Sequence, residues 1–376
     1  MMIPLVKDQQ GNVSDVNNNR GITLSPIVSK IFEHALKFIF SMFLETSSNQ
    51  FGFKKRSSTI HAIHCLKGTI DYYVNNGSRV FCGFLDASKA FDRIVHAGLF
   101  LKMIKRKVPF LFLIISWYIG LECRVRWEDH YSDWFAVTAG VRQGGVLSPN
   151  FYCIYVDDLI DMLKALGIGC YYLGIFAAAL FYADDMAILA PSIKALSLLL
   201  DTCSSYCQSW DICLNAKKSR HMYFGKKTTI SHQISLNGKT VEWADTWVYL
   251  GITLKSGKTF SCSITEQVKK FYRCVNGIFR IEGRSNDTVM LRLVEAHCVP
   301  ILTYGIETLH VADRDERRQL RVVYNCLFRK IFGYRSYESV SALQDFLGRP
   351  TCQHGNNLWR IEFFPFIKGS VTQGQM

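Results

Sequence analysis

Two apolar runs separated by a pair of acidic residues are the strongest feature of the hydrophobic pattern of this chain. Residues 175–183 and 186–190 form the runs, and Asp184 and Asp185 stand between them. Apolar runs are usually buried, and two buried carboxylates repel each other unless a cation or a proton intervenes. The pair is therefore either a solvated turn or a metal site, and the flanking runs predict buried strands joined by a hairpin.

The rest of the chain alternates between extended and helical patterns. Strands are predicted at residues 3–6 and 79–86 and near Met222, Ile234 and Val248, and a hairpin at residues 123–127 and 133–137. Helical spacing occurs in residues 27–43, 90–104, 150–166, 192–210 and 314–332. From about residue 259 the pattern is helical, so a mixed α/β lobe is expected to precede a helical lobe.

Residues 165–183 carry no charge and are long enough to cross a membrane. Three glycines interrupt the segment, at positions 167, 169 and 174, and it leads directly into the acidic pair. Two buried strands joined by a turn explain this composition better than a membrane helix. We therefore expect no membrane partner.

Composition favours a globular protein with a polyanionic partner. The 376 residues are 49% hydrophobic and 20% charged, which suits a sizeable core and argues against wholesale disorder. Lys and Arg exceed Asp and Glu by 44 to 31, and by 15 to 8 within residues 255–335. A basic surface that serves only solubility is the alternative. The 13 cysteines contain no C-x-x-C pair, which favours free thiols over a zinc site or disulfides.

A third acidic residue, Asp86, ends the apolar strand predicted at residues 79–86. If this strand and the acidic hairpin are neighbours in one antiparallel sheet, the three carboxylates meet at one end of it. Carboxylate oxygens suit Mg²⁺, and two metal ions about 3.5–4 Å apart support in-line phosphoryl transfer. Taken singly, an Asp at a strand end is more often a turn residue.

Three segments around these acids resemble successive motifs of reverse transcriptases, in particular those of non-LTR (LINE-type) retrotransposons. They are DASKAFD at residues 86–92, RQGGVLSP at 142–149 and FYADD at 181–185. Other blocks resemble the same family in the same order: residues 4–8 with 18–22 and 29–33, residues 50–53 with 57–59, residues 214–219, and residues 249–251. Ordered matches over residues 3–350 make chance a poor explanation.

The resemblance implies an α+β fold, a right-hand polymerase with fingers, an antiparallel-sheet palm with an RRM-like core, and a helical thumb. We expect partial fingers at residues 1–78, and a palm at 79–258 with inserted finger elements near 105–138. A basic thumb is expected at 259–335 and a C-terminal tail at 336–376. Upstream finger segments and the endonuclease domain of such elements are expected to be missing from the chain.

The resemblance also implies roles for individual residues. Asp86, Asp184 and Asp185 are expected to be catalytic and to bind two Mg²⁺ ions, with Mn²⁺ as an alternative metal. Lys218, or the adjacent Lys217, is expected to protonate the departing pyrophosphate. The expected nucleotide-binding residues are Lys7, Arg20, Ala87, Phe91, Gln143, Gly144 and Gly145, and the expected primer grip is Tyr249, Leu250 and Gly251. Phe91 is the expected steric gate against a ribose 2′-hydroxyl; a core aromatic is its alternative.

The sequence therefore predicts an RNA-directed DNA polymerase that uses an RNA template, a DNA primer and deoxynucleoside triphosphates, in the cytoplasm or the nucleus. A catalytically inactive nucleic-acid-binding remnant of a retrotransposon polyprotein is the alternative. An unrelated two-metal phosphodiesterase would not need these motifs in polymerase order. The oligomeric state is left open.

Overall fold

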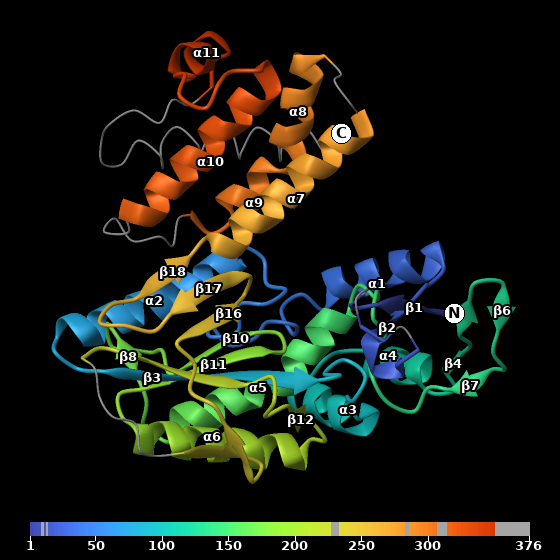
Figure 1. Cartoon of the computed structure of the whole chain (residues 1–376). Coiled ribbons are helices and arrows are strands. Elements are labelled where there is room, and N and C mark those ends of the chain that lie inside the picture. Colours follow the sequence, from blue (N-terminus) through green and yellow to red (C-terminus); the bar gives the residue numbers. More distant parts are fainter. Residues whose placement is uncertain (9–10, 13, 227–232, 283–285, 307–313, 350–376) are drawn as a thin grey trace. The chain divides into compact units, whose positions relative to one another are not determined.

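The computed structural model describes residues 1–8, 11–12, 14–226, 233–282, 286–306 and 314–349 (Figure 1). The chain divides into two compact units, Met1–Asp245 and Thr246–Met376. Each unit is described by itself. Residues 350–376, most of the expected C-terminal tail, lie outside the described residues.

An antiparallel sheet forms the centre of the first unit. Its strands are β3 (Val80–Ser88), β10 (Ala179–Tyr182), β11 (Asp185–Ala190) and β13 (Arg220–Phe224), in the order β10–β11–β3–β13, and the short β12 (Cys213–Leu214) pairs with the end of β3. Helices separate β3 from β10 and β11 from β13 along the chain. This βαββαβ order is that of an RRM-like sheet. The predicted α+β class and antiparallel palm are confirmed.

Helices cover both faces of this sheet because its central strands are apolar on both faces. In β3 and β11, residues 80–85 and 186–190 are all buried. Helices α5 (Ser148–Ala165) and α6 (Ile193–Ser209) lie below the sheet in Figure 1 and share one hydrophobic core with it. Helix α2 (Thr59–Asn75) lies on the other side and contacts β10. Ser192 caps α6 by accepting a hydrogen bond from the Ala195 N–H.

The helix predicted over residues 90–104 begins later than expected. The structure has α3 at His96–Lys105, after a β3 strand that continues to Ser88. Lys89 adopts a left-handed conformation (φ +51°), and the Asp92 N–H donates to the Lys89 carbonyl at 3.0 Å, so the chain turns before the helix starts. Phe91 therefore lies in a turn and not on a helix.

Small elements surround the sheet in the first unit. Strands β1 (Met2–Val6) and β2 (Asn19–Thr23) form an antiparallel ribbon, with the 3-10 turn η1 (Val16–Asn18) before β2. The predicted hairpin is present as two short pairs, β4 (Glu122–Cys123) with β7 (Phe135–Ala136) and β5 (Arg126–Trp127) with β6 (His130–Tyr131). The remaining elements are α4 (Leu111–Tyr118), β8 (Tyr171–Tyr172), β9 (Ile175–Phe176), β14 (Ile234–Leu236) and β15 (Lys239–Val241).

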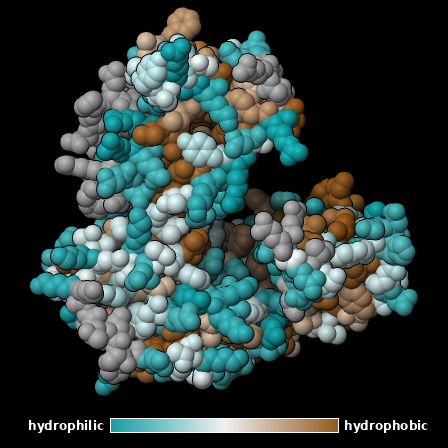
Figure 2. All heavy atoms as spheres, in the orientation of Figure 1, coloured by the Kyte–Doolittle hydropathy of each residue, from teal (hydrophilic) through white to brown (hydrophobic). Residues whose placement is uncertain are grey.

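Helix α1 (Ile27–Ile39) is shorter than the predicted segment 27–43, and it is unusual in exposing apolar side chains. Its buried side carries Glu33 and Leu36. Its solvent side carries Ile27, Val28 and Ile31, and hydrophobic atoms are visible on the surface over α1 in Figure 2. A carboxylate on the buried side of an amphipathic helix needs hydrogen-bond donors from elsewhere in the fold.

The second unit is a small sheet followed by helices. Strands β16 (Thr246–Tyr249), β17 (Ile252–Lys255) and β18 (Ser261–Ser263) precede α7 (Thr265–Glu282), α8 (Asp287–His297), α9 (Val299–Thr303), α10 (Arg314–Phe332) and α11 (Ser341–Phe346). Phe271 of α7, Val294 of α8 and Phe328 of α10 belong to one core, to which Leu302 of α9 also contributes. The helix predicted at 314–332 is confirmed. Within the described residues, no helix is long and apolar enough to cross a membrane.

The backbone of Gly169 gives a test of the packing next to the acidic hairpin. Gly169 has φ +100°, and a Cβ there would lie 2.4 Å from the Ala178 Cβ, whereas Gly167 has φ +64° and open space around it. We expect Gly167→Ala to lower the free energy of unfolding by about 1 kcal/mol, through backbone strain alone. Gly169→Ala adds overpacking and should cost at least about 1 kcal/mol more. Urea denaturation measures both; equal losses would contradict the packing.

Candidate active site

Strand pairing brings the three predicted carboxylates to one end of the sheet. Asp185 lies directly opposite Asp86 in the antiparallel register of β11 and β3. Asp184 occupies the turn between β10 and β11. The strands are buried up to this point, so the acids lie where the apolar part of the sheet ends. Cross-strand carboxylates repel each other, and nothing in the local sheet geometry favours this arrangement.

The turn that carries the acids is held by a buried amide. Ala183 has φ +56°, a conformation that side-chain-bearing residues rarely adopt. The Oε1 atom of Gln50, which is 0% exposed, accepts hydrogen bonds from the Ala183 and Gly52 N–H groups, each at 3.1 Å. A Cβ on Gly52 would lie 2.7 Å from the Ala183 nitrogen. The sequence placed Gln50 in a family-like block and gave it no role; the structure shows that it fixes the turn.

The pKa values of all three carboxyl groups are raised. Loss of hydration, followed by the charges of Asp184 and Asp86, raises the pKa of Asp185 to about 6. Loss of hydration is also the main cause of the raised pKa of Asp86 and of Asp184, and the charge of Asp86 adds to the shift at Asp184. The Asp185 side chain is nevertheless exposed, so a cation from solvent can reach it.

The donor set fits a hard divalent cation in its chemistry. Among the described residues, no group of three or more His, Cys, Asp or Glu side chains is already arranged around one metal position. The charge of Asp86 raises the pKa of Asp184, and the charges of both raise the pKa of Asp185, so a divalent cation would relieve this repulsion. Carboxylate oxygens are also the ligands that Mg²⁺ prefers. These acids are therefore the residues that would hold the metal.

Three predicted cationic residues from distant parts of the chain act on these acids. The positive charges of Lys218 and Lys7 lower the pKa of Asp86 against the effect of burial, and that of Arg20 does the same at Asp184. Lys7 follows β1 and Arg20 lies on the paired strand β2. The ribbon thus brings two of the predicted phosphate-binding cations toward the acids.

Of the two adjacent lysines, Lys218 is the one whose charge lowers the pKa of Asp86. Its loop is fastened to the end of β3. The Asn215 N–H donates to the Asp86 carbonyl at 2.9 Å, and the Asp86 N–H donates to the Ser219 Oγ at 3.2 Å. The hydroxyl of Ser219 was not recognised from the sequence as part of this attachment.

A buried carboxylate holds the glycine-rich loop. Glu33, 1% exposed, accepts hydrogen bonds from the N–H groups of Val146 and Leu147, the latter at 2.9 Å. It also forms an ion pair with Arg142 at 3.3 Å, and the Arg142 guanidinium lies 4.0 Å from the centre of the Trp117 ring. No role for Glu33 is apparent from its sequence context, since an isolated Glu in a helical pattern is usually solvent-exposed.

The two glycines of this loop permit close packing, against the β1–β2 ribbon at Gly144 and against the start of α5 at Gly145. Gly144 has φ +105°, and a Cβ there would lie 2.9 Å from the Thr23 carbonyl oxygen. A Cβ on Gly145 would lie 2.6 Å from the Ser148 Oγ. The Thr23 N–H in turn donates to the Gln143 carbonyl at 2.7 Å. The loop therefore depends on glycine for its own fold, whether or not a ligand is bound.

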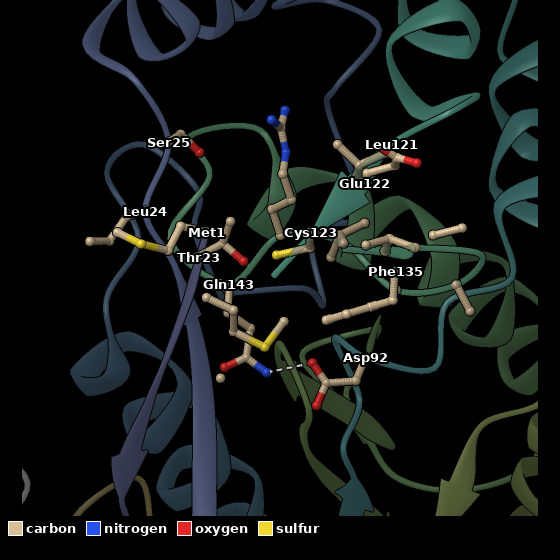
Figure 3. A pocket seen from close by; sticks show the side chains of 18 of the residues that line it. Met1, Thr23, Leu24, Ser25, Asp92, Leu121, Glu122, Cys123, Phe135 and Gln143 are labelled. Atoms are coloured by element: carbon tan, nitrogen blue, oxygen red, sulfur yellow. Dashed lines mark hydrogen bonds between the residues drawn. The ribbon is translucent and has the colours of Figure 1, made fainter. Parts of the chain in front are cut away.

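The side chain of Gln143 faces a cavity of about 530 Å³. Its Nε2 atom donates to the Asp92 Oδ1 at 2.8 Å, as drawn in Figure 3. Thr23, Cys123 and Phe135 also line this cavity. It lies between the β1–β2 ribbon, the β4–β7 pair and the glycine-rich loop.

Phe91 and Ala87 differ in what they can contribute. Phe91 is half-buried, and its ring stacks on that of Tyr152 with centroids 5.0 Å apart. Ala87 follows Asp86 on β3, where successive side chains point to opposite faces, and its side chain is buried in the core. Only the backbone of Ala87 is thus available beside the acids.

The predicted primer-grip residues lie in the second unit. Tyr249 ends β16, and Leu250 and Gly251 form the turn that leads to β17. Leu250 and Gly251 both have positive φ values, +46° and +79°. The Tyr304 hydroxyl donates to the Leu250 carbonyl at 2.9 Å, and a Cβ on Gly251 would lie 3.0 Å from the Tyr304 ring. The turn, with Tyr249 before it, is thus fixed within its own unit, and its action on a primer stays a prediction.

Comparison with known proteins identifies relatives over most of the chain. The model of the family described as reverse transcriptase (RNA-dependent DNA polymerase) matches residues 7–254. The RNA-directed DNA polymerase from mobile element jockey of Drosophila melanogaster is 26% identical over 337 residues, which cover 85% of this chain and 36% of the relative. The probable RNA-directed DNA polymerase from transposon BS of the same species is 28% identical over 330 residues, 83% of this chain and 36% of the relative.

The chain thus spans 36% of the length of these two relatives. Among solved structures, telomerase from Candida tropicalis in complex with a TWJ fragment of telomeric RNA is similar over 93% of this chain and 54% of that chain. Its TM-score is 0.47 and its sequence identity 12%.

The raised pKa of Asp185 predicts a pH-dependent stability. The carboxyl holds its proton to about pH 6 in the folded protein and to a lower pH when unfolded, so folding is relatively favoured as pH falls through that interval. In metal-free buffer, Asp185→Asn should be more stable than wild type at about pH 7.5, and the difference should shrink toward about pH 5. Urea denaturation at the two pH values measures this; a pH-independent difference would contradict the shift.

The Glu33 contacts predict that a small change will disrupt the glycine-rich loop. Glu33→Gln should lower the free energy of unfolding by about 3 kcal/mol, because the Arg142 charge loses its partner and an amide nitrogen faces N–H donors. The control is Glu45→Gln, at an exposed position where the effect should stay within about 0.5 kcal/mol. Thermal or urea denaturation compares the two, and equal effects would show that Glu33 is not a structural anchor.

Proposed function

This chain belongs to the reverse transcriptase (RNA-dependent DNA polymerase) family, and from that we propose that it is itself an RNA-directed DNA polymerase. It would add deoxynucleotides to the 3′-hydroxyl of a DNA primer on an RNA template. The observation that carries the proposal is the pairing of Asp86 with Asp185, with Asp184 in the adjoining turn. The two Drosophila relatives, both named as RNA-directed DNA polymerases, support it.

The three acids would hold two Mg²⁺ ions. When bound, such metal ions activate the attacking hydroxyl and stabilise the leaving phosphate oxygen. The chain's own part is to present the carboxylates on a rigid sheet end, with the turn fixed by Gln50. Preorganised charge of this kind needs little rearrangement during the reaction.

The cations around the acids suit a triphosphate. Lys7 would bind it as a point charge and Arg20 as a planar fork. Lys218 lies close enough to Asp86 to affect its pKa, which suits protonation of the departing pyrophosphate. The opposite charges of these residues and of the phosphates would also attract the nucleotide to the site.

The remaining predicted residues would select and orient the substrates. Phe91 would lie under the sugar, where its ring leaves no room for a ribose 2′-hydroxyl. Gln143 and the backbone of Gly144 and Gly145 would lie against the nucleotide and the template. The turn of residues 249–251 would position the primer end, and the basic second unit would contact the phosphates of the duplex.

Primer extension on an RNA template tests the proposal. We expect wild type to incorporate deoxynucleotides with Mg²⁺, and Asp184→Ala to reduce incorporation at least about 100-fold, since removal of one preorganised charge at a reacting group costs that much. Binding of primer–template, measured by gel shift, should persist in the variant, because it depends on phosphate contacts.

Asp201→Asn is the control, since Asp201 is exposed on α6, and it should leave incorporation unchanged. Equal incorporation by wild type and Asp184→Ala would overturn the assignment of the metal site. Primer–template binding by wild type without any incorporation would instead favour a nucleic-acid-binding remnant.

A further inference from the structure

Tyr152 is a buried tyrosine that no step of the proposed reaction uses. It lies in the second turn of α5, and its side chain is 0% exposed. Its ring stacks on that of Phe91, with centroids 5.0 Å apart and planes 23° from parallel. Phe53 meets the Phe91 ring only edge-on, at 6.5 Å. The flat surface that supports Phe91 is therefore the ring of Tyr152.

The hydroxyl of Tyr152 is buried with no hydrogen-bond partner among the described residues. Such a group normally lowers stability, because it gives up its bonds to water and gains none. Burial raises the pKa of this hydroxyl, and the charge of Asp184 is the next cause. The contacts of its neighbour place Tyr152 beside the acidic turn, since the Cys153 thiol touches Gly52, which packs against Ala183. A phenylalanine would give the same stacking without the unpaired group.

The backbone around Tyr152 leaves it little freedom to move. The residues before α5 are held by Glu33 through the Leu147 N–H. The neighbouring Cys153 Sγ lies 3.7 Å from the carbonyl oxygen of Gly52, the glycine that packs against the acidic turn. Tyr152 is therefore fixed to the same framework as the acids, while Phe91 lies in the turn after β3.

We propose that Tyr152 is a positioning residue that links the sugar gate to the metal-binding acids. Its ring sets the height of Phe91 beneath the incoming sugar, and its hydroxyl donates to the Asp184 carboxylate when that side chain turns to bind a cation. The inference rests on the proposed function and deepens it. Two different parts of one side chain thus serve two parts of the site, which makes them separable by mutation.

Two substitutions separate the ring from the hydroxyl. Tyr152→Phe keeps the stacking and should leave the preference for deoxynucleotides over ribonucleotides unchanged. Tyr152→Leu removes the stacking and should lower that preference about tenfold, since an aromatic pair contributes on that order. Phe91→Ala is the reference for loss of the gate. Tyr155→Leu, at another buried tyrosine of α5 that contacts Trp210, is the control for general disturbance of the helix.

The preference is measured both by single-nucleotide incorporation and by binding. In the binding form, a primer ending in a dideoxynucleotide traps the complex, and gel shift compares the deoxynucleotide with the ribonucleotide. An unchanged preference in Tyr152→Leu, with a reduced one in Phe91→Ala, would overturn the role of the ring. Tyr152→Phe loses only an unpartnered hydroxyl, so it should fold at least as well as wild type. A changed nucleotide preference in Tyr152→Phe would also overturn the role of the ring, whether or not the leucine variant folds.

The hydroxyl is tested by cation-induced stabilisation, which needs no catalysis. Titration with Mg²⁺ should raise the melting temperature of wild type, and Tyr152→Phe should need about tenfold more cation, a typical effect of removing a group that orients a metal ligand. Identical titrations would overturn this role. If wild type bound the cation but incorporated no nucleotide, the polymerase proposal would fail. The comparison of Mg²⁺ titrations between wild type and Tyr152→Phe would still test the link between the hydroxyl and Asp184.

Discussion

Repulsion among three carboxylates at the end of an apolar sheet is the constraint on which the first unit depends. Asp86 and Asp185 are forced opposite each other because the apolar residues that precede and follow them must pair in register inside the core. A one-residue slip would place every buried side chain on the wrong face, so the repulsion cannot be relieved by sliding the strands. The positive charges of Lys7, Arg20 and Lys218 offset it in part.

A second charge arrangement ties helix α1 to the glycine-rich loop. Glu33 belongs to α1, yet its carboxylate accepts hydrogen bonds from the Val146 and Leu147 N–H groups just before α5 and pairs with Arg142. The glycine-rich loop is therefore fixed by α1 and leads directly into the first turn of α5. Movement of α1 would leave buried donors unsatisfied, so the loop and the helix are expected to move together.

The sequence predicted the pieces that depend on local pattern or on ordered motifs. The acidic hairpin, β3 and the helix at 314–332 follow from hydrophobic periodicity, and the antiparallel sheet with an RRM-like core followed from the family resemblance. It did not predict the late start of α3, because a left-handed Lys89 leaves no mark in the periodicity. Nor did it reveal Gln50 or Glu33 as anchors, because their partners are backbone N–H groups brought near by tertiary folding.

The contact between Gly52 and Ala183 has a consequence for how this protein tolerates mutation. The backbone nitrogen of Ala183 occupies the space that a side chain at Gly52 would need, and Ala183 itself is buried in a left-handed turn. A larger residue at Gly52 would displace the backbone of the acidic turn, so position 52 constrains the acids although the two are far apart in sequence. Because the obstacle is a backbone atom, no change of side chain at position 183 makes room for it, and a mutational scan is expected to find position 52 restricted to glycine while its neighbours vary.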